Sequence, residues 1–412
     1  MKVRLSYFNS KINLSNPVIT ITGSKSESNR FLILQRLFPK IHLENLSNSD
    51  DTLLLKEGLN SSIRNIDVNH AGTSMRFLAA YYSMIEESSI SLTGSIRMQE
   101  RPIGVLVNAL RVLGADISYI NKEGFPPLQI KGKKISGGKI EMDAGISSQF
   151  ISAMMLIAPA LKNGLTIELK GKIASRSYIE LTLGVLKKIG VDCRFDENMI
   201  SIKPFSLDEK ITIPIESDWS SASYWYSIVA MSKGLTVTLK HFDPSSLQGD
   251  SIVAPIFEKL GVSTTFHSSG SSITITKNNV ALPDIIQLDL IETPDLAQTL
   301  AVTCFGLGLN SVLLGLKTLQ IKETDRLTAL KNELEKLGAN VVVSSNSIRI
   351  NPTKNIHENV EINTYDDHRM ALSFAALAMR KSIVIDRTDV VSKSYPSYWD
   401  DLKKAGFSLT FE

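Results

Sequence analysis

Cationic side chains stand at several places where a helix is expected to begin. They are Lys25 and Arg30 in "GSKSESNR", Arg76 in "AGTSMRF", Lys322 and Arg326 in "KETDRL", and Arg369 in "DDHRM". A helix N-terminus carries free N–H groups and a partial positive charge, so acids are favoured there and bases are not. A base at this position makes sense when a small anion binds beside it, because the helix start and the cation then attract the same ligand. These segments therefore predict anion-binding sites.

The strongest of these signals is the pair Lys322 and Arg326, which are four residues apart. On a helix, two like charges at this spacing cost stability, and an anion between them would offset that cost. The segment "GSKSESNR" is not a nucleotide-binding P-loop, since it lacks the G-x-x-x-x-G-K-[ST] pattern. The serines at these starts also have an ordinary explanation as helix N-caps, so the prediction rests on the set of starts rather than on one of them.

Two acids with possible proton-transfer roles lie among the cations, Asp295 in "ETPDLAQTL" and Glu323 in "KETDR". A carboxylate near several cations stays ionised and can act as a base, whereas one with a raised pKa can act as an acid. Further polar residues stand in loops: Arg101 in "SIRMQERPIG", Ser175 and Tyr178 in "KIASRSYIEL", and Lys393 in "VVSKSYPSYW". The chain shows no G-x-S-x-G nucleophile motif.

Composition excludes several other classes of protein. The 412 residues carry a net charge of +3 without a long basic run, which argues against nucleic acid as a partner. The six histidines lack metal-ligand spacing, which argues against a zinc site. Two cysteines far apart suit a reducing compartment, and no apolar run is long enough for a membrane span. We therefore expect a cytoplasmic protein, and the length favours two domains.

A repeated pattern predicts how these segments are positioned. An amphipathic helix ends at a glycine and is followed by a strand at Gly114, Gly190, Gly261 and Gly338, each with a second strand close behind. A fifth copy, "LKKAGFSLTF", closes the chain without the second strand, and a sixth, "LLKEGLNSSIRNIDV", is weaker. With an earlier helix in each copy, the unit reads β-α-β-α-β-β. Six such units predict an α/β protein with two pseudo-symmetric domains of three units each, although a run of ordinary α/β crossovers is an alternative.

Taken together and in order, the segments "GSKSESNR", "AGTSMRFLAA", "RMQERPIG", "SSQF", "KETDRL" and "DDHRMA" resemble the 5-enolpyruvylshikimate-3-phosphate synthases. The resemblance runs from about Val18 to Tyr398. It implies a two-domain inverse α/β barrel of six β-α-β-α-β-β repeats, with chain crossings near 22 and 217. One domain would then be 22–217, on the shikimate 3-phosphate side, and the other would join 1–21 to 218–412.

The resemblance also implies an activity, the transfer of the enolpyruvyl group of phosphoenolpyruvate to the 5-hydroxyl of shikimate 3-phosphate. It places Asp295 as the base and Glu323 as the acid, with Lys25 and Lys393 as further candidates for proton transfer. Shikimate 3-phosphate would be held by Lys25, Ser26, Arg30, Ser147, Ser148, Gln149, Ser175, Tyr178, Asp295 and Lys322. Phosphoenolpyruvate would be held by Lys25, Gly72, Arg101, Gln149, Arg326, Arg369 and Lys393. No cofactor is implied, and we expect a monomer whose domains close around its two substrates.

Three positions depart from the family's pattern: His70 and Phe77 flank the "AGTSMR" loop, and Thr318 stands where asparagine is usual. The first two affect the surroundings of Gly72, and the third affects one contact with shikimate 3-phosphate. Because position 72 is glycine, the resemblance implies sensitivity to glyphosate, an inhibitor that occupies the phosphoenolpyruvate site.

Two alternatives remain open. The sister enolpyruvyl transferase that acts on UDP-N-acetylglucosamine shares the fold, but it typically carries a cysteine in the loop that here reads "SIRMQERPIG", and a Lys-Asn pair where this chain has Lys25-Ser26. A non-catalytic anion-binding protein would explain the cations. It would not explain Asp295 and Glu323, because acids weaken anion binding.

Overall fold

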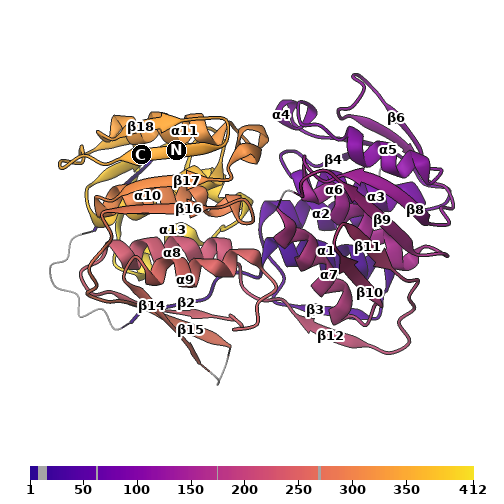
Figure 1. Cartoon of the computed structure of the whole chain (residues 1–412), viewed down its shortest axis with the longest axis horizontal. Coiled ribbons are helices and arrows are strands. Elements are labelled where there is room, and N and C mark those ends of the chain that lie inside the picture. The colour runs from indigo at the N-terminus through magenta and orange to yellow at the C-terminus, as the bar shows by residue number, and fades with distance from the viewer. Residues whose placement is uncertain (8–15, 62–63, 174, 268–270) are drawn as a thin grey trace. The chain divides into compact units, whose positions relative to one another are not determined.

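The computed structural model describes residues 1–7, 16–61, 64–173, 175–267 and 271–412. The chain forms two compact units (Figure 1). The middle unit comprises Gly23–Ile215, and the terminal unit joins Met1–Thr22 to Glu216–Glu412. Each unit has its own sheets and its own buried helices, and the two are described separately.

The middle unit contains two four-stranded sheets and one parallel pair of strands. The first sheet has the order β4 (Asn65–Asp67), β5 (Ser89–Thr93), β7 (Leu128–Lys131) and β6 (Asp116–Tyr119). The second has the order β8 (Gly138–Asp143), β9 (Leu165–Lys170), β11 (Met199–Ile202) and β10 (Cys193–Asp196). The pair is β12 (Ile211–Pro214) with β3 (Ile41–Glu44). Its helices are α1 (Lys25–Leu37), α2 (Asp50–Asn60), α3 (Gly72–Met84), α4 (Ile96–Gln99), α5 (Gly104–Val112), α6 (Ser148–Ile157) and α7 (Arg176–Lys188), with η1 (Ala158–Ala160).

The terminal unit contains three four-stranded sheets. The first has the order β2 (Val18–Ile19), β13 (Thr236–Lys240), β15 (Ser272–Lys277) and β14 (Val262–His267). The second has the order β16 (Ile285–Asp289), β17 (Asn310–Leu314), β19 (Ser347–Asn351) and β18 (Asn340–Val343). The third has the order β20 (Val360–Ile362), β21 (Ile383–Ile385), β1 (Val3–Ser6) and β22 (Ser408–Phe411). Its helices are α8 (Trp219–Met231), α9 (Val253–Glu258), α10 (Ala297–Leu307), α11 (Arg326–Lys336), α12 (His368–Ala375) and α13 (Tyr398–Lys404). Short 3-10 turns are η2 (Gly249–Ile252), η3 (Pro294–Leu296), η4 (Lys317–Ile321), η5 (Ala376–Met379) and η6 (Thr388–Lys393).

Every four-stranded sheet has the same pattern. The first two strands are parallel, and the next two are antiparallel, as in β8, β9, β11 and β10. A parallel pair needs a crossover, which α6 provides between β8 and β9, while the antiparallel strands β10 and β11 form a hairpin after the helix-ending glycine. The predicted α/β class and the repeated unit are therefore confirmed.

Helices form the interior of each unit and sheets form its outer wall. In the terminal unit α8, α10 and α12 contact one another and are buried on almost every side, and Figure 1 shows α8 and α10 side by side. In the middle unit α1, α3 and α6 pack together in the same way. A helix that is apolar all round belongs in a core, whereas strands such as β8 alternate between buried and exposed residues and so have one face toward solvent.

Two copies of the repeat differ from the sequence-based expectation. The fifth copy, which ends at β22, obtains its missing strand from the other end of the chain, because β1 lies between β21 and β22. The strand of the sixth copy, β4, is the first strand of the sheet β4, β5, β7 and β6, and the strands β3 and β12 are left as a parallel pair without a hairpin. The glycine of the sixth copy, Gly58, lies inside α2 and does not end that helix. A Cβ at position 58 would lie 2.6 Å from Leu78 Cδ1, so the glycine permits close helix packing; Ser62 and Ile63 of this copy lie outside the described residues.

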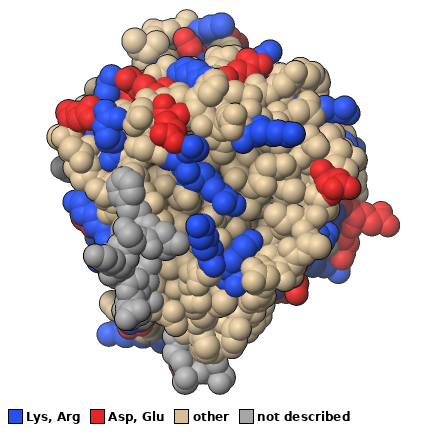
Figure 2. All heavy atoms as spheres, turned by 90° about the vertical axis from the view of Figure 1, so that its left-hand side faces the viewer, with Lys and Arg blue, Asp and Glu red and all other residues tan. Residues whose placement is uncertain are grey.

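The surface shows the near balance of charges seen in the composition. Figure 2 shows one face, on which Lys and Arg side chains are separated by uncharged surface and accompanied by Asp and Glu side chains. Among the described residues, every helix falls short of the length and apolarity needed to span a bilayer. In the same part of the chain, no cluster of three or more His, Cys, Asp or Glu side chains is arranged to hold a metal ion.

Candidate active site

The three buried helices of the terminal unit begin close together. Asp218 caps α8, since its Oδ1 accepts a hydrogen bond from the backbone N–H of Ser221 at 2.8 Å. Asp367 caps α12 in the same way, through the N–H of Arg369 at 2.9 Å. The turn η3, with Asp295, leads directly into α10. Side-chain contacts of Arg369 with Asp295 and with the first turn of α8 hold the three starts together, so several positive helix ends face one region.

Arg326 is the most heavily paired cation of this region. It is the first residue of α11, is 1% exposed, and contacts three carboxylates. Its Nε lies 2.6 Å from Asp367 Oδ2, its Nη1 2.9 Å from Asp295 Oδ1, and its Nη2 2.8 Å from Glu323 Oε2. Burial alone lowers the pKa of an arginine, but the three carboxylates outweigh burial and raise the pKa of Arg326 above its ordinary value. Arg326 is therefore a permanent positive charge in the core of the site.

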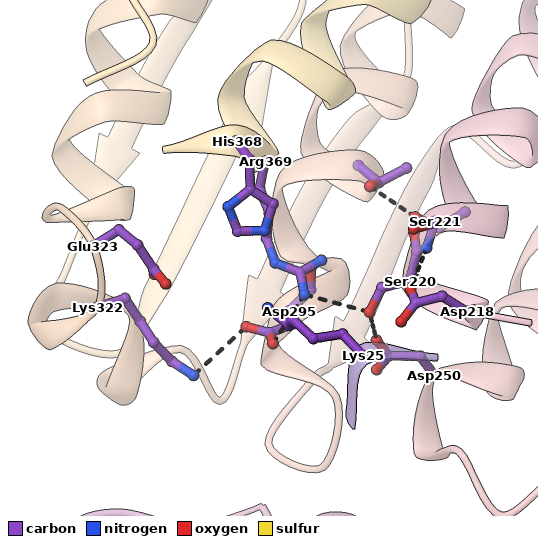
Figure 3. A network of polar contacts seen from close by, with 12 residues as sticks. Lys25, Asp218, Ser220, Ser221, Asp250, Asp295, Lys322, Glu323, His368 and Arg369 are labelled. Atoms are coloured by element: carbon purple, nitrogen blue, oxygen red, sulfur yellow. Dashed lines mark hydrogen bonds and ion pairs between the residues drawn. The ribbon is translucent and has the colours of Figure 1, made fainter. Parts of the chain in front are cut away.

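Asp295 lies between three cations, two of which, Lys322 and Arg369, are labelled beside it in Figure 3. Besides Arg326, its carboxylate contacts Arg369 Nη2 at 3.1 Å and Lys322 Nζ at 3.6 Å. Burial raises the pKa of Asp295, but the attraction of Arg369, Lys322 and Arg326 prevails and brings this pKa well below its usual range. Asp295 is thus ionised and able to accept a proton.

The interpretation of Lys322 and Arg326 as neighbours on one helix is wrong. Lys322 follows η4 and precedes α11, which begins only at Arg326, so the helical i,i+4 repulsion does not arise. An anion does lie between them, and it is the carboxylate of Asp295, which both side chains contact.

Glu323 lies between two cations of its own. Its Oε2 contacts Arg326, and its Oε1 is 3.0 Å from Lys393 Nζ. Lys393 ends η6 and is 7% exposed. The two acids and four cations that the sequence singled out in this unit, namely Asp295, Glu323, Lys322, Arg326, Arg369 and Lys393, thus form one connected network.

The middle unit has a comparable set of helix starts. Lys25 is the first residue of α1, after the N-cap Ser24, and its Nζ lies 3.3 Å from Asp51 Oδ2. The backbone carbonyl of Asp51 accepts a hydrogen bond from Ser74 Oγ in the first turn of α3 at 2.9 Å. Asp51 therefore connects the starts of α1 and α3 and holds the ammonium group of Lys25.

Arg30 is directed toward protein groups in this structure. Its guanidinium, 3% exposed, donates to Thr182 Oγ1 at 2.8 Å, to Ser152 Oγ at 3.1 Å, and to the backbone carbonyls of Ser26 and Tyr178 at 2.8 and 3.2 Å. Burial lowers the pKa of Arg30 to about 10. Arg30 thus fixes the backbone of Ser26 and Tyr178, two other residues expected to bind shikimate 3-phosphate.

Gly72 and Arg101 are in contact at the start of α3. A Cβ built at position 72 would lie 2.7 Å from Arg101 Nη1, so the guanidinium packs against the glycine. Gln149, in the first turn of α6, donates to Thr73 Oγ1 at 3.3 Å. Ser147 caps α6 and Ser148 is its first residue, so the start of α6 also lies beside that of α3.

Ser175, the residue before α7, has a left-handed backbone with φ of 53°. This conformation is costly for a residue other than glycine and is found preferentially at functional sites. Tyr178 lies in the first turn of α7, with its N–H bonded to the Ser175 carbonyl at 3.1 Å. The preceding Ala174, part of the segment "KIASRSYIEL", lies outside the described residues.

The three departures from the family's pattern have distinct surroundings. His70 Nδ1 is 2.9 Å from Ser95 Oγ, and Phe77 is buried with the Arg30 guanidinium 5.7 Å from its ring centroid. Thr318 lies on η4, and its Oγ1 is buried with no hydrogen-bond partner among the described residues. None of the three removes a charge from the site.

The sequence-based reasoning missed several residues that hold the cations. They are Asp51, Ser220, Asp250 and Asp367. Asp367 had a local signal, since it directly precedes "HRM" and an acid there is a typical N-cap. Asp51 and Asp250 had none, because their partners lie 26 and 30 residues away in the sequence.

Fold and site together define an α/β protein that brings cations and carboxylates to the starts of buried helices, an arrangement suited to reactions of small anions. The family model described as EPSP synthase (3-phosphoshikimate 1-carboxyvinyltransferase) matches residues 55–402. The chain is 44% identical over 398 residues to the 3-phosphoshikimate 1-carboxyvinyltransferase of Bacteroides fragilis, covering 95% of each chain, and 34% identical over 420 residues to that of Histophilus somni, covering 94% of this chain and 95% of the relative. The chain belongs to the EPSP synthase family.

Solved structures agree at the level of the fold. The EPSP synthase of Acinetobacter baumannii superposes with a TM-score of 0.76 at 20% identity, over 100% of both chains. The enolpyruvyl transferase NikO of Streptomyces tendae gives 0.71 at 12% identity, over 99% of this chain and 98% of that one.

Proposed function

We propose that the protein transfers the enolpyruvyl group of phosphoenolpyruvate to the 5-hydroxyl of shikimate 3-phosphate, as a 3-phosphoshikimate 1-carboxyvinyltransferase of aromatic amino-acid biosynthesis. The observation that carries this proposal is the network of Asp295 and Glu323 among Lys322, Arg326, Arg369 and Lys393. Each substrate has a phosphate and a carboxylate, so binding them needs several cations. The reaction also needs one group that takes a proton and one that gives a proton.

The chemistry proceeds by addition and then elimination. Asp295, which is ionised, takes the proton of the 5-hydroxyl as that oxygen attacks C2 of phosphoenolpyruvate. Glu323 delivers a proton to the methylene carbon, which becomes a methyl group, and Lys393 at 3.0 Å can supply Glu323 with that proton. In the second step the Glu323 carboxylate takes a proton from the methyl group, the carbon–oxygen bond to phosphate breaks, and phosphate leaves with the electrons of that bond.

Ligand roles follow the resemblance and the geometry together. Shikimate 3-phosphate is assigned to Lys25, Ser26, Ser147, Ser148, Gln149, Ser175, Tyr178, Asp295 and Lys322, with Arg30 fixing two of these residues or exchanging a protein contact for the ligand. Phosphoenolpyruvate is assigned to Lys25, Gly72, Arg101, Gln149, Arg326, Arg369 and Lys393. We further propose that the protein is cytoplasmic and monomeric. Light scattering after gel filtration measures its mass in solution and checks the monomer.

The test is phosphate release from phosphoenolpyruvate by the purified, folded protein. Release that depends on shikimate 3-phosphate supports the proposal. Release only with UDP-N-acetylglucosamine as acceptor contradicts it in favour of the sister transferase. Binding of both anions without release indicates a non-catalytic relative.

Replacement of Arg101 or Lys393 by alanine is expected to raise the KM for phosphoenolpyruvate by about ten- to a hundred-fold, because a hydrogen bond to a charged group contributes about 1.5–3 kcal/mol. Steady-state kinetics with phosphoenolpyruvate varied at saturating shikimate 3-phosphate measures the effect. Lys381→Ala removes an exposed lysine paired with Glu358 and should leave the kinetics unchanged. A KM within two-fold of wild type in either site variant contradicts the assignment.

Replacement of Gly72 by alanine is expected to weaken inhibition by glyphosate about ten-fold. The new methyl group meets the Arg101 guanidinium, and such crowding costs about 1–3 kcal/mol. Inhibition constants against phosphoenolpyruvate measure the effect. The matched control is Gly104→Ala, where the added carbon would be 3.4 Å from its nearest neighbour. Equal inhibition of wild type and Gly72→Ala places glyphosate elsewhere.

A further inference from the structure

Ser220 and Asp250 form a contact that the reaction scheme above does not use (Figure 3). Ser220 is the second residue of α8, and its hydroxyl donates a hydrogen bond to Asp250 Oδ2. The same Oγ accepts a hydrogen bond from Arg369 Nη2 at 3.3 Å. A chain of contacts therefore runs from Asp250 through Ser220 to Arg369, and it starts at a carboxylate that is only 6% exposed.

The direction of these bonds matters because a serine hydroxyl has one proton and two lone pairs. Asp250 accepts the one hydrogen bond that the Ser220 hydroxyl can donate. A lone pair of Oγ therefore remains to accept a hydrogen bond from the guanidinium. Without an acceptor on the Asp250 side, the hydroxyl could turn its proton toward Arg369, which has only donors. Asp250 thus sets the polarity of Ser220.

Arg369 needs a hydrogen-bond acceptor that stays in place while its other partner, Asp295, changes its charge during the reaction. Its Nη2 is shared between Ser220 and Asp295 Oδ2, while its Nη1 contacts the Asp295 carbonyl at 3.2 Å and Tyr224 Oη at 3.4 Å. When the Asp295 carboxylate receives a proton, its attraction for Arg369 falls. Ser220 still accepts from Nη2 in that state.

A purely structural role for Asp250 explains less. The loop before η2 is already held by Gln248, whose Oε1 accepts from the N–H of Trp219 at 3.0 Å and whose Nε2 donates to Glu216 Oε2 at 3.0 Å and to the Ser217 carbonyl at 2.9 Å. Burying a carboxylate costs free energy unless it is paired and hydrogen-bonded, and the partner of Asp250 is Ser220, which in turn contacts Arg369. Two further acids, Asp295 and Asp218, also lie near Asp250, and their negative charges repel its carboxylate.

We infer that Ser220 and Asp250 are positioning residues that hold the Arg369 guanidinium in the orientation that binds phosphoenolpyruvate. This inference rests on the proposed function, because it assigns Arg369 to that substrate. Among the cations of the network, Arg369 is the one to which Ser220 is hydrogen-bonded at 3.3 Å.

The pair also has a pH dependence of known sign. Burial is the main cause that raises the pKa of Asp250 to about 6, and the neighbouring Asp295 and Asp218 raise it further, while Arg369 and the Ser220 hydrogen bond lower it. Below this pH Asp250 gains a proton and loses its charge, and it can then donate to a lone pair of Ser220 Oγ, which weakens that oxygen as an acceptor for Arg369. The KM for phosphoenolpyruvate should therefore rise as the pH falls through about 6 in the wild-type protein.

The experiment compares Ser220→Ala and Asp250→Asn with wild type in the phosphate-release assay, with each substrate varied in turn. We expect the KM for phosphoenolpyruvate to rise about ten-fold in Ser220→Ala, with the KM for shikimate 3-phosphate unchanged. Ser220→Thr keeps the hydroxyl and should restore most of the affinity. Ser227→Ala is the matched control, since Ser227 lies on the same helix, is buried, and is bonded to Thr303 away from Arg369.

The Asp250→Asn variant supplies the readout that a structural role would not change. Because the phosphate of phosphoenolpyruvate itself titrates near pH 6, the comparison is the difference between variant and wild type, and we expect the extra rise in KM at low pH to disappear. The inference is overturned if the KM for phosphoenolpyruvate stays within two-fold in Ser220→Ala. It is also overturned if both KM values and the melting temperature shift together in both variants. A wild-type protein that releases no phosphate overturns the proposed function first, and this assignment with it.

Discussion

Replacement of Asp295 by asparagine should lower kcat by about 1,000-fold while leaving the KM for phosphoenolpyruvate unchanged or lower. The loss of kcat follows from chemistry, because an amide cannot accept the proton of the attacking hydroxyl, and general-base catalysis contributes about 10²–10⁴-fold. The direction of the KM change follows from geometry. The Asp295 carboxylate pairs with Arg326, Arg369 and Lys322, and it therefore competes with an anionic substrate for the same cations.

This combination of effects distinguishes a base from a binding group. Loss of a group that holds substrate would raise the KM, whereas loss of a competing carboxylate should not. Pre-steady-state measurement of the first turnover, together with equilibrium binding of phosphoenolpyruvate, would separate the two steps. The control is Asp325→Asn, because Asp325 caps α11 by accepting from two backbone N–H groups and asparagine caps a helix equally well. A kcat within ten-fold of wild type in Asp295→Asn would exclude Asp295 as the base.

The low pKa of Asp295 has a consequence for how the base is activated. In the substrate-free arrangement its cations hold the proton affinity down, so Asp295 is ionised but weak. An anionic substrate that takes over Arg326 and Arg369 would leave Asp295 with fewer positive neighbours and a higher pKa. Substrate binding and activation of the base are then the same event, which couples deprotonation of the hydroxyl to the presence of phosphoenolpyruvate.

The repeat was predictable from the sequence because its signal is local. A helix that ends at a glycine must place that residue in a left-handed conformation, and Gly114, Gly190, Gly261 and Gly338 all have φ between 79° and 101°. The strand β1 could not be assigned to the last unit in this way. It pairs with β21 and β22 about 400 residues along the chain, and nothing in its four residues specifies a distant partner. Gly58 shows that the local pattern can mislead. There a glycine follows an amphipathic helical segment because two helices pack closely, and it does not end the helix.

The site was predictable in part, for the same reason. Cations at helix starts are visible in the sequence as local exceptions to a physical rule, and this is how Lys25, Arg326 and Arg369 could be found. Lys322 was singled out by the same reasoning, although it precedes α11 and does not begin it. No local sequence pattern marks most of the carboxylate partners of these cations, because only the fold brings those acids close to the cations. Asp51 and Asp250 each pair across at least 26 residues, so only the structure identifies them.

Replacement of Arg326 by methionine should destabilise the terminal unit by about 3–5 kcal/mol at neutral pH. Methionine fills a similar volume, but its introduction leaves Asp367, Asp295 and Glu323 facing one another around an uncharged centre. Breaking a buried ion pair by removing one partner has this cost because the remaining charge stays desolvated and uncompensated. Phosphoenolpyruvate binding should be lost as well, since the methionine offers no donor.

The pH dependence gives this prediction its distinguishing feature. In the wild-type protein the cations hold the pKa of Asp295 well below 3.8, so the stabilisation from this carboxylate is kept between pH 8 and pH 5 and is lost only as the pH falls below about 3.8. In Arg326→Met the clustered carboxylates repel one another, so protonation on going from pH 8 to pH 5 should relieve the repulsion and increase the melting temperature. Arg349→Met, at an exposed position of β19, should change stability by no more than about 0.5 kcal/mol. Thermal melts of the three proteins across this pH range test the prediction, and an Arg326→Met protein whose melting temperature follows that of wild type from pH 8 to pH 5 would show that Arg326 does not balance the three acids.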